Sequence, residues 1–572
     1  GPIGIARGGF HAVDDGSRQE LFFSGAQLTG LDASLSVSGV LKDYLVGLNG
    51  ADLRLAGEMG SESVEWFARA IGLSPLLKPR SPLSVSNGLL KYSRNVGASF
   101  KGDLVVDKGP KVAIDILKED QNLCIRNLLV QDGDTNATMK LDVTREAFNL
   151  DFSGCLTKGT MKRLFQEDKA ARGWLEGDML IHFQRDEPAE SKARGRLKGG
   201  DLLVPLGVKG PLEIDSISLD AKENALRLHS ALCLWQDNRL AAKGDVHFAD
   251  EGLQVDMALS TEDLDWNTIA NAFNRDSEVE KGEGPLWALP LCGKVQLDAG
   301  RFTYDRMVWT PFRANVAFTQ DAIDVAVLEA NLCSIGTAGT VRVTPGDISL
   351  QFRPAATNED LGAAFTCLLK EKQQMTGTFS LGGQITAQEK PEALLESARG
   401  NLAFSAKDGR IYRYGLLARV LAFVNLTEVF RGKVPSLAQE GLPYDSMEAE
   451  ASIEAGRLTV KEGIFMGPSV EIACAGEVDL MKEEYDLTYL VAPLKTVDSV
   501  AKKIPLLGRL LGGTVVSIPV KVTGDWSNPT VEPLSASAVG SGILGMMERA
   551  LKLPVEVLEW LPSGETQKEA VD

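Results

Sequence analysis

Most of the chain alternates apolar and polar residues with a spacing of two, which is the pattern of half-buried β-strands. Glycine, aspartate and asparagine mark the turns between these stretches. The longest clear stretch, 470–480, places valine, isoleucine and leucine on one side of a strand and carboxylates on the other. Similar stretches follow at 485–491 and 516–522. The pattern predicts a mainly β protein with antiparallel meanders.

A weak repeat of strands followed by a short helix recurs along the chain, which makes the order of elements periodic. The helices are expected near 61–67, 158–165, 261–273 and 358–365. In the last two, a Thr or Asn followed by acidic residues predicts an N-cap and a favourable charge in the first turn. Sheet units that pack mainly on their neighbours predict an elongated molecule.

The texture of the sequence divides the chain into three predicted regions. Residues 1–200 and 201–394 are predicted to be repetitive β regions, and 395–572 a region that ends in amphipathic helices. The apolar stripe of the last helices consists of Ile543, Met547, Leu551 and Leu558. Packing on the protein core is the usual role of such a stripe, and contact with a membrane surface is the alternative, which makes this a candidate membrane-proximal helix. No stretch is long and apolar enough to span a bilayer.

The charge and the scarcity of histidine exclude several classes of function. With 60 Lys and Arg against 78 Asp and Glu, the net charge is −18, which argues against a nucleic-acid partner. Only four histidines occur, so most zinc sites and Ser-His-Asp triads are excluded. The seven cysteines form no closely spaced pair of the metal or redox type. We therefore expect no metal and no cofactor.

Two short motifs match enzyme signatures but lack their companions. Residues 540–545 fit the dinucleotide fingerprint, yet too little chain follows for the required βαβ unit. Residues 499–502 have the Ser-x-x-Lys spacing of acylating enzymes without the other motifs of that class. Scarce aromatic residues, 6% of the chain, leave few platforms for sugars, although abundant carboxylates keep a carbohydrate-active enzyme as a third alternative. We expect that the protein is not an enzyme.

The cysteines allow two interpretations. Cys124 and Cys333 occupy the same place in the repeat, and Cys155 and Cys367 lie further along the same copies. Small buried hydrophobic side chains are the default interpretation. The alternative is a pair of disulfides, Cys124–Cys155 and Cys333–Cys367, that staple adjacent elements in an oxidising compartment.

The last third of the chain contains a series of motifs in a specific order. They are Leu402–Ile411, a helix that ends at Leu426–Phe430, Leu442–Tyr444, Pro505–Gly513, Ile518–Gly524, Trp526–Pro529 and Gly542–Leu544. In this order they resemble the AsmA-like C-terminal region. The part of the chain before residue 395 resembles that family only in its repetitive β texture.

The resemblance implies a bridge-like lipid-transfer protein of diderm bacteria. Such proteins have an inner-membrane anchor and a long twisted sheet whose concave apolar face carries phospholipid acyl chains through the periplasm. The chain begins Gly-Pro-Ile-Gly without an initiator Met or a signal sequence, so we expect that the anchor and part of the N-terminal body are missing. The implied partners are phospholipids, the inner membrane through that anchor, and the outer membrane or its proteins.

An apolar sheet face must be covered, because exposed apolar surface costs about 25 cal/mol per Å². Periodicity alone allows a second sheet or lipid tails as the cover, and the resemblance favours lipid. The expected fold is therefore mainly β, with elongated, twisted antiparallel sheet units that form an open, U-shaped apolar groove and short helices between the units. The residues expected to line the groove are Val470, Ile472, Val478, Leu480, Ile518 and Val520.

The leading functional hypothesis is a non-enzymatic lipid conduit in the periplasm, anchored in the inner membrane in the full-length protein. Its terminal helices would close the groove or touch the outer membrane. The alternative, from another class of function, is a structural scaffold or assembly factor for outer-membrane proteins that acts through open sheet edges.

Overall fold

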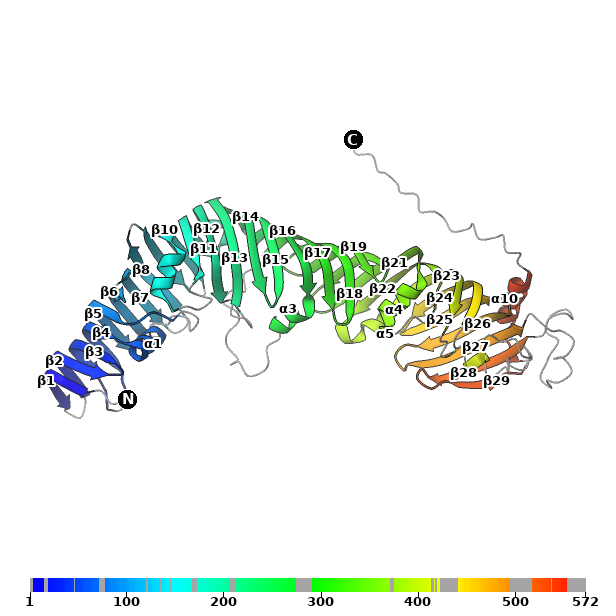
Figure 1. Ribbon diagram of the computed structural model, residues 1–572, viewed down its shortest axis with the longest axis horizontal. Coiled ribbons are helices and arrows are strands. Elements are labelled where there is room, and N and C mark those ends of the chain that lie inside the picture. Colours follow the sequence, from blue (N-terminus) through cyan, green and yellow to red (C-terminus); the bar gives the residue numbers. More distant parts are fainter. Residues whose placement is uncertain are drawn as a thin grey trace, which may run out of the picture. The chain divides into compact units, whose positions relative to one another are not determined.

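The computed structural model confirms the prediction of a mainly β protein with short helices. The residues that it describes are 4–14, 19–45, 47–70, 78–107, 109–119, 122–133, 135–144, 146–166, 172–205, 211–273, 291–370, 375–412, 416, 419–421, 441–493, 517–535 and 538–552. These residues form 29 strands (Figure 1). None of the helices among these residues has the length and hydropathy that a membrane crossing requires.

The chain divides into two compact units. The first contains Gly1–Arg306 and Arg313–Asp321, and the second contains Met307–Phe312 and Ala322–Asp572. This division differs from the three regions predicted from the sequence. The predicted boundary at 200 falls inside a strand, Lys192–Pro205, that pairs with a strand on each side.

In the first unit, each strand from β1 to β15 pairs antiparallel with the next strand in the chain, whereas β16 and β17 pair in parallel. The strands are β1 (Gly4–Asp14), β2 (Gln19–Gly30), β3 (Ala33–Lys42), β4 (Gly50–Met59), β5 (Leu83–Ser93), β6 (Gly97–Val106), β7 (Lys111–Glu119), β8 (Asn122–Asp132), β9 (Thr135–Val143), β10 (Ala147–Leu156), β11 (Trp174–Gln184), β12 (Lys192–Pro205), β13 (Pro211–Glu223), β14 (Ala225–Trp235), β15 (Asn238–Ala249), β16 (Gly252–Asp265) and β17 (Leu291–Tyr304).

In the second unit, the strands from β19 to β29 pair antiparallel in chain order. The strands are β19 (Ile323–Leu332), β20 (Ile335–Val343), β21 (Ile348–Asp360), β22 (Thr378–Glu389), β23 (Arg399–Ile411), β24 (Leu442–Glu454), β25 (Arg457–Met466), β26 (Val470–Asp479), β27 (Glu484–Pro493), β28 (Ile518–Asp525) and β29 (Thr530–Pro533). Strand β18 (Met307–Phe318) contributes residues to both units.

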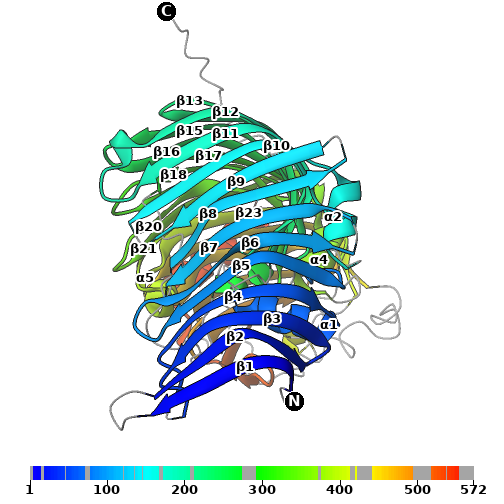
Figure 2. The ribbon, with the colours of Figure 1, turned by 90° about the vertical axis from the view of Figure 1, so that its left-hand side faces the viewer.

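Three helices of the first unit recur at equal intervals of the sheet. They are α1 (Ser61–Ala70) after β4, α2 (Lys158–Leu164) after β10 and α3 (Trp266–Phe273) after β16, so six strands separate each helix from the next. Because consecutive antiparallel strands run in opposite directions, the chain is at the same ends of the strands again after an even number of strands. Figure 2 shows α1 and α2 at the same ends of their strands.

The second unit includes the helices α4 (Leu361–Leu369), α5 (Leu394–Ser397) and α10 (Ser541–Lys552). Among the described residues, single-turn 3-10 helices η2 (Pro188–Glu190) in the first unit and η3 (Pro391–Ala393) in the second precede β12 and α5. Helix α4 begins at Leu361, later than the expected start at 358, because 359 and 360 still pair with β22 as the end of β21. Its N-cap is therefore Asp360 and not Asn358, and the Asp360 carboxylate accepts a hydrogen bond from the Ala363 N–H at 2.7 Å.

The expected helix start at residue 261 is wrong. Strand β16 continues to Asp265, because 261–265 pair in parallel with β17. The helix therefore begins at Trp266, and the Asp265 carboxylate accepts a hydrogen bond from the N–H of Asn267 at 2.9 Å. Pairing with the next strand outweighs the capping signal of Thr261 and the acidic residues after it.

Each unit has apolar clusters in which helices pack on the sheet. In the first unit, α1 places Val64 and Phe67 against β5 and β6, and the Phe67 ring meets the Phe100 ring edge-on, with centroids 4.8 Å apart. In the second unit, Leu361 and Ala364 of α4 belong to a cluster that extends from β21 to β28. Helix α10 packs on the other side of β26 and β27, with Met547 fully buried.

Two adjacent glycines of β22 test how closely the strands approach each other. A Cβ atom on Gly383 would lie 2.2 Å from the carbonyl oxygen of Asn401, whereas one on Gly382 would have no atom within 4 Å. We expect Gly383→Ala to lower the free energy of unfolding by about 2 kcal/mol or more. The control, Gly382→Ala, should change it by less than about 0.5 kcal/mol. Denaturant titrations that give equal losses for both variants would contradict the close approach.

Candidate functional site

Three rows of apolar residues and glycines cross eight neighbouring strands of the first unit, from β10 to β17. Residues of a row lie directly opposite one another in the strand pairings. The first row is Phe152, Met179, Gly195, Ala221, Leu226, Val246, Val255 and Gly293. The middle row is Gly154, Gly177, Leu197, Leu219, Leu228, Gly244, Met257 and Val295. The third row is Leu156, Leu175, Gly199, Ile217, Ala231, Ala242, Leu259 and Leu297. We call these the apolar rows, and their side of the sheet the apolar face.

The apolar face is concave at one end of these strands. Phe183 on β11 and Phe248 on β15 lie on this face, and their ring centroids are 5.7 Å apart. Four strand spacings separate them along the sheet, which is about 19 Å on a flat sheet. Two phenylalanine side chains cannot bridge that distance and still meet. The sheet must therefore bend toward its apolar face between β11 and β15.

Much of the apolar face toward β17 is only half-buried. Leu228, Met257 and Val295 of the middle row and Leu259 and Leu297 of the third row all have intermediate exposure. A large apolar residue in a closed core is normally almost completely buried. These side chains therefore reach solvent along a continuous strip of the concave face, which makes the strip a candidate binding surface for an apolar ligand.

The opposite face carries ion pairs between directly opposed residues. Arg227 donates to Asp245 at 2.7 Å, and Lys294 lies 3.2 Å from Asp256. The hydrogen bond from Arg227 lowers the pKa of the Asp245 carboxyl group. Such exposed pairs contribute little to stability, because water screens the attraction between the charges. Their main effect is to keep this face polar and to fix the register of the strands.

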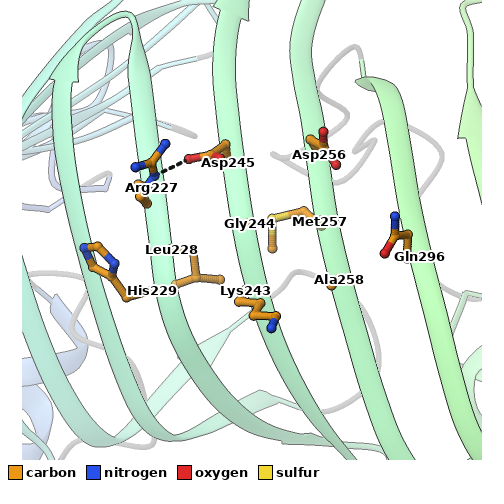
Figure 3. A pocket seen from close by; sticks show the side chains of 10 residues that line it. All are labelled: Arg227, Leu228, His229, Lys243, Gly244, Asp245, Asp256, Met257, Ala258 and Gln296. Carbon is orange, nitrogen blue, oxygen red and sulfur yellow. Dashed lines mark hydrogen bonds and ion pairs between the residues drawn. The ribbon is translucent and has the colours of Figure 1, made fainter. Parts of the chain in front are cut away.

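A shallow hollow of about 410 Å³ lies at β14–β17. Figure 3 shows its lining side chains on these neighbouring strands, with the bond between Arg227 and Asp245. Asp256 is paired with Lys294, and His229 is paired with Asp220. Because these charged groups pair with neighbours on the sheet, the hollow has the character of a structural surface. In the described part of the chain, no group of three His, Cys, Asp or Glu residues could hold a metal ion.

The groove residues predicted from the sequence lie together in the second unit. Val470, Ile472, Val478 and Val520 are buried in one cluster, and Leu480 and Ile518 pack against it. Ile472 is 3% exposed and Val520 is fully buried. Their neighbours in this cluster include Val420 and Leu421, which are side chains of the protein itself. Contact of these six residues with acyl chains stays a prediction.

The stripe of the last helix faces the sheet where its side chains are described. Met547 is fully buried against β26 and β27, and Ile543 packs against the same cluster. For these two residues the structure shows core packing, the first of the two interpretations of the stripe. The side chain of Leu551 and all of Leu558 lie outside the described residues.

One of the two predicted disulfides is present. Cys333, in the turn between β19 and β20, is bonded to Cys367 of α4, with Cα atoms 5.6 Å apart. Cys124 and Cys155 are both free, so the other pairing is wrong. Cys124 lies opposite Asp142, which lies opposite Asn149 on β10. Cys155 is six residues further along that strand, about 20 Å away, beyond the reach of a disulfide.

The apolar rows of the first unit are a site that the sequence did not predict. The signal was present in 253–259, where apolar residues alternate with polar ones. Glycines at many row positions interrupt the same alternation in the neighbouring strands, for example at Gly177 and Gly244. The rows become visible only when the register of all eight strands is known.

A comparison with known protein families gives a match to this chain. The model of a family described as YhdP protein matches residues 202–531, more than half of the chain. The matched range includes the half-buried strip and the cluster of predicted groove residues. No curated protein matches the chain.

A buried carboxyl group beneath α10 makes stability depend on pH. Glu471 of β26 is 8% exposed, and its Oε2 atom has no hydrogen-bond partner. Burial raises the pKa of this carboxyl group, so the folded protein holds the proton more tightly than the unfolded chain. The resulting stabilisation is complete below the unfolded pKa of about 4.3 and is lost as the pH rises through the folded pKa.

We therefore expect Glu471→Gln to stabilise the protein at neutral pH, and the gain to disappear as the pH falls toward that of the unfolded carboxyl. Urea titrations at several pH values measure the difference. Glu448→Gln, at an exposed position of β24, is the control and should leave the pH profile unchanged. A pH-independent gain for Glu471→Gln would contradict the buried, uncompensated carboxyl group.

The disulfide predicts a count of reactive thiols. Alkylation of the denatured protein without reductant should modify five cysteines, and after reduction it should modify all seven. The Cys333→Ser variant should show six modified thiols in both conditions, because Cys367 then loses its partner. Mass spectrometry gives the counts. Modification of all seven thiols without reductant would rule out the bond.

Proposed function

The chain belongs to the YhdP family, and from this premise we propose that it is a periplasmic conduit that carries phospholipid acyl chains along its apolar face. Membership of this family suggests a lipid-transport-related role. The observation that carries the finer proposal is the half-buried strip of the apolar rows in the first unit.

The energetics of this strip favour a hydrocarbon ligand. Exposed apolar surface costs about 25 cal/mol per Å², so a chain of methylene groups that covers Leu228, Met257 and Leu259 gains free energy by removing them from water. The concave bend between β11 and β15 lets an extended chain contact several strands at once. A flat sheet would contact an acyl chain from one side only, whereas a bent sheet partly surrounds it.

The chemistry of the rows also favours movement along the strip. Their residues are aliphatic, aromatic, methionine or glycine, without a directed hydrogen-bonding group among them. Apolar contact is non-directional, so neighbouring positions bind an acyl chain with nearly equal free energy. A ligand held in this way can slide from strand to strand.

The compartment and partners belong to the same proposal. The Cys333–Cys367 bond supports an oxidising compartment such as the periplasm. The inner-membrane anchor, contact with the outer membrane or its proteins, and the absence of enzymatic activity are further parts of the proposal. The acidic net charge of −18 supports a partner other than nucleic acid.

The alternative function is a scaffold that acts through sheet edges. Analysis of the lipid bound to the purified protein distinguishes this scaffold from a conduit. A conduit should carry phospholipid in native mass spectrometry or in an organic extract of the purified protein. A scaffold for outer-membrane proteins should carry none in stoichiometric amount.

A charge on the apolar face tests the conduit directly. We expect Val255→Asp to lower bound lipid and lipid transfer between vesicles by about tenfold, because a carboxylate in the path must be desolvated by the acyl chain. Val255 is half-buried, so the variant should fold, as circular dichroism can verify. Gln254→Asp, its exposed neighbour on the polar side of β16, is the matched control and should transfer lipid normally.

Two results would count against this site. Val255→Asp could fold and transfer lipid like the parent, or Gln254→Asp could lose transfer to the same degree. A charge at Ile472 is a poorer test, because that residue is 3% exposed in a closed cluster and its substitution should unfold the second unit.

A further inference from the structure

The apolar face of the second unit has an occupant from the chain itself. Val420 is fully buried and Leu421 is 4% exposed, and both belong to the cluster that contains Ile472, Val520 and Val522. Two bulky aliphatic side chains thus fill a place on the face that the alternating pattern of β26 and β28 presents. We call Arg419, Val420 and Leu421 the stopper.

The stopper is held by polar contacts at one point. The Arg419 guanidinium donates from Nη1 to the Asn528 side-chain oxygen at 2.9 Å and to the Pro529 carbonyl oxygen at 3.1 Å. Both acceptors lie in the turn between β28 and β29, more than a hundred residues further along the chain. These hydrogen bonds place Val420 and Leu421 over the last strands of the unit.

Helix α4 covers the same cluster but is held much more firmly. Its Leu361 and Ala364 are buried in the cluster, its N-terminus is capped by Asp360, and Cys367 ties it covalently to Cys333. The described contacts of the stopper include hydrogen bonds and apolar packing and no covalent bond. Of the two covers, the stopper is therefore the one that can be displaced without breaking a covalent bond.

Displacement is inexpensive when an acyl chain takes the vacated place. The cluster beneath the stopper is apolar, and apolar contact does not distinguish a leucine side chain from methylene groups of a lipid. Exchange of one cover for the other leaves the buried apolar area of the strands nearly unchanged. The balance then depends on the hydrogen bonds of Arg419 and on the supply of lipid.

We propose that the stopper is an internal competitor for lipid, which closes the apolar face of the second unit until an acyl chain displaces Val420 and Leu421. This inference rests on the proposed conduit function. It adds a device that is closed in the absence of lipid, and it assigns Arg419 as the residue that sets how readily the face opens.

Photo-crosslinking at two positions tests the stopper and the conduit separately. A diazirine analogue of leucine replaces Leu228 on the half-buried strip or Ile518 beneath the stopper's cluster. Each full-length protein is mixed with phosphatidylethanolamine and phosphatidylglycerol vesicles that contain alkyne-tagged acyl chains. Lipid adducts at position 228 report on the conduit alone, and adducts at position 518 report on the stopper.

In the parent protein we expect strong labelling at 228 and weak labelling at 518. Arg419→Ala removes both hydrogen bonds of the stopper and should raise labelling at 518 by about tenfold, with labelling at 228 unchanged. Arg342→Ala is the matched control, since Arg342 is also in the second unit but pairs with Asp324 on a polar surface. It should leave both positions unchanged.

A second variant keeps the test decisive if Arg419→Ala does not fold. Val420→Ala with Leu421→Ala shortens the side chains that fill the face and should also raise labelling at 518. The stopper is overturned if position 518 is labelled as strongly as 228 in the parent, or if folded variants leave 518 unlabelled. If position 228 is unlabelled in the parent while the stopper variants raise labelling at 518, the conduit site on the half-buried strip is overturned and the stopper is supported.

Discussion

The structure depends on one constraint, which is that a sheet with one apolar face needs a cover for that face. The strands alternate so regularly that the apolar residues of each strand align with those of its neighbours, and three such rows cross β10–β17. In the first strands of the chain the cover includes α1 and α2, and in the second unit it includes α4 and the stopper. Toward β17, the middle and third rows are half-buried. The incomplete cover distinguishes this face from an ordinary β core, and the proposed conduit function rests on it.

The polar face explains how the sheet tolerates an incompletely covered side. Directly opposed ion pairs such as Arg227–Asp245 and Lys294–Asp256 hold the register from the solvent side. Each is weak, but a slip of one residue would turn its charges toward the apolar face and turn apolar side chains toward water. The strands therefore keep their alignment whether or not a ligand covers the rows. In the proposed conduit, binding and release of lipid would therefore not require the sheet to unfold.

The sequence predicted the parts of this fold that depend on local patterns. Strands β26 and β27 and the Cys333–Cys367 pairing follow from alternation and the repeat. The missed features depend on register. Cys124 and Cys155 occupy suitable places in the repeat but lie about 20 Å apart along the paired strands. The six predicted groove residues do share one face, yet whether a lipid or Val420 covers that face cannot be read from alternation.

The even number of strands between helices has a consequence for how such a chain can change in length. Insertion or deletion of a hairpin adds or removes two strands, so every later helix stays at the same ends of the strands. A single added antiparallel strand would move those helices to the opposite ends of the strands. The parallel pair β16 and β17 is an exception to this rule, because two parallel strands begin at the same end of the sheet and one added strand then does not reverse the direction of the chain. Evolution can therefore extend the molecule in hairpin steps at many places, and can correct an odd count at a junction of this kind.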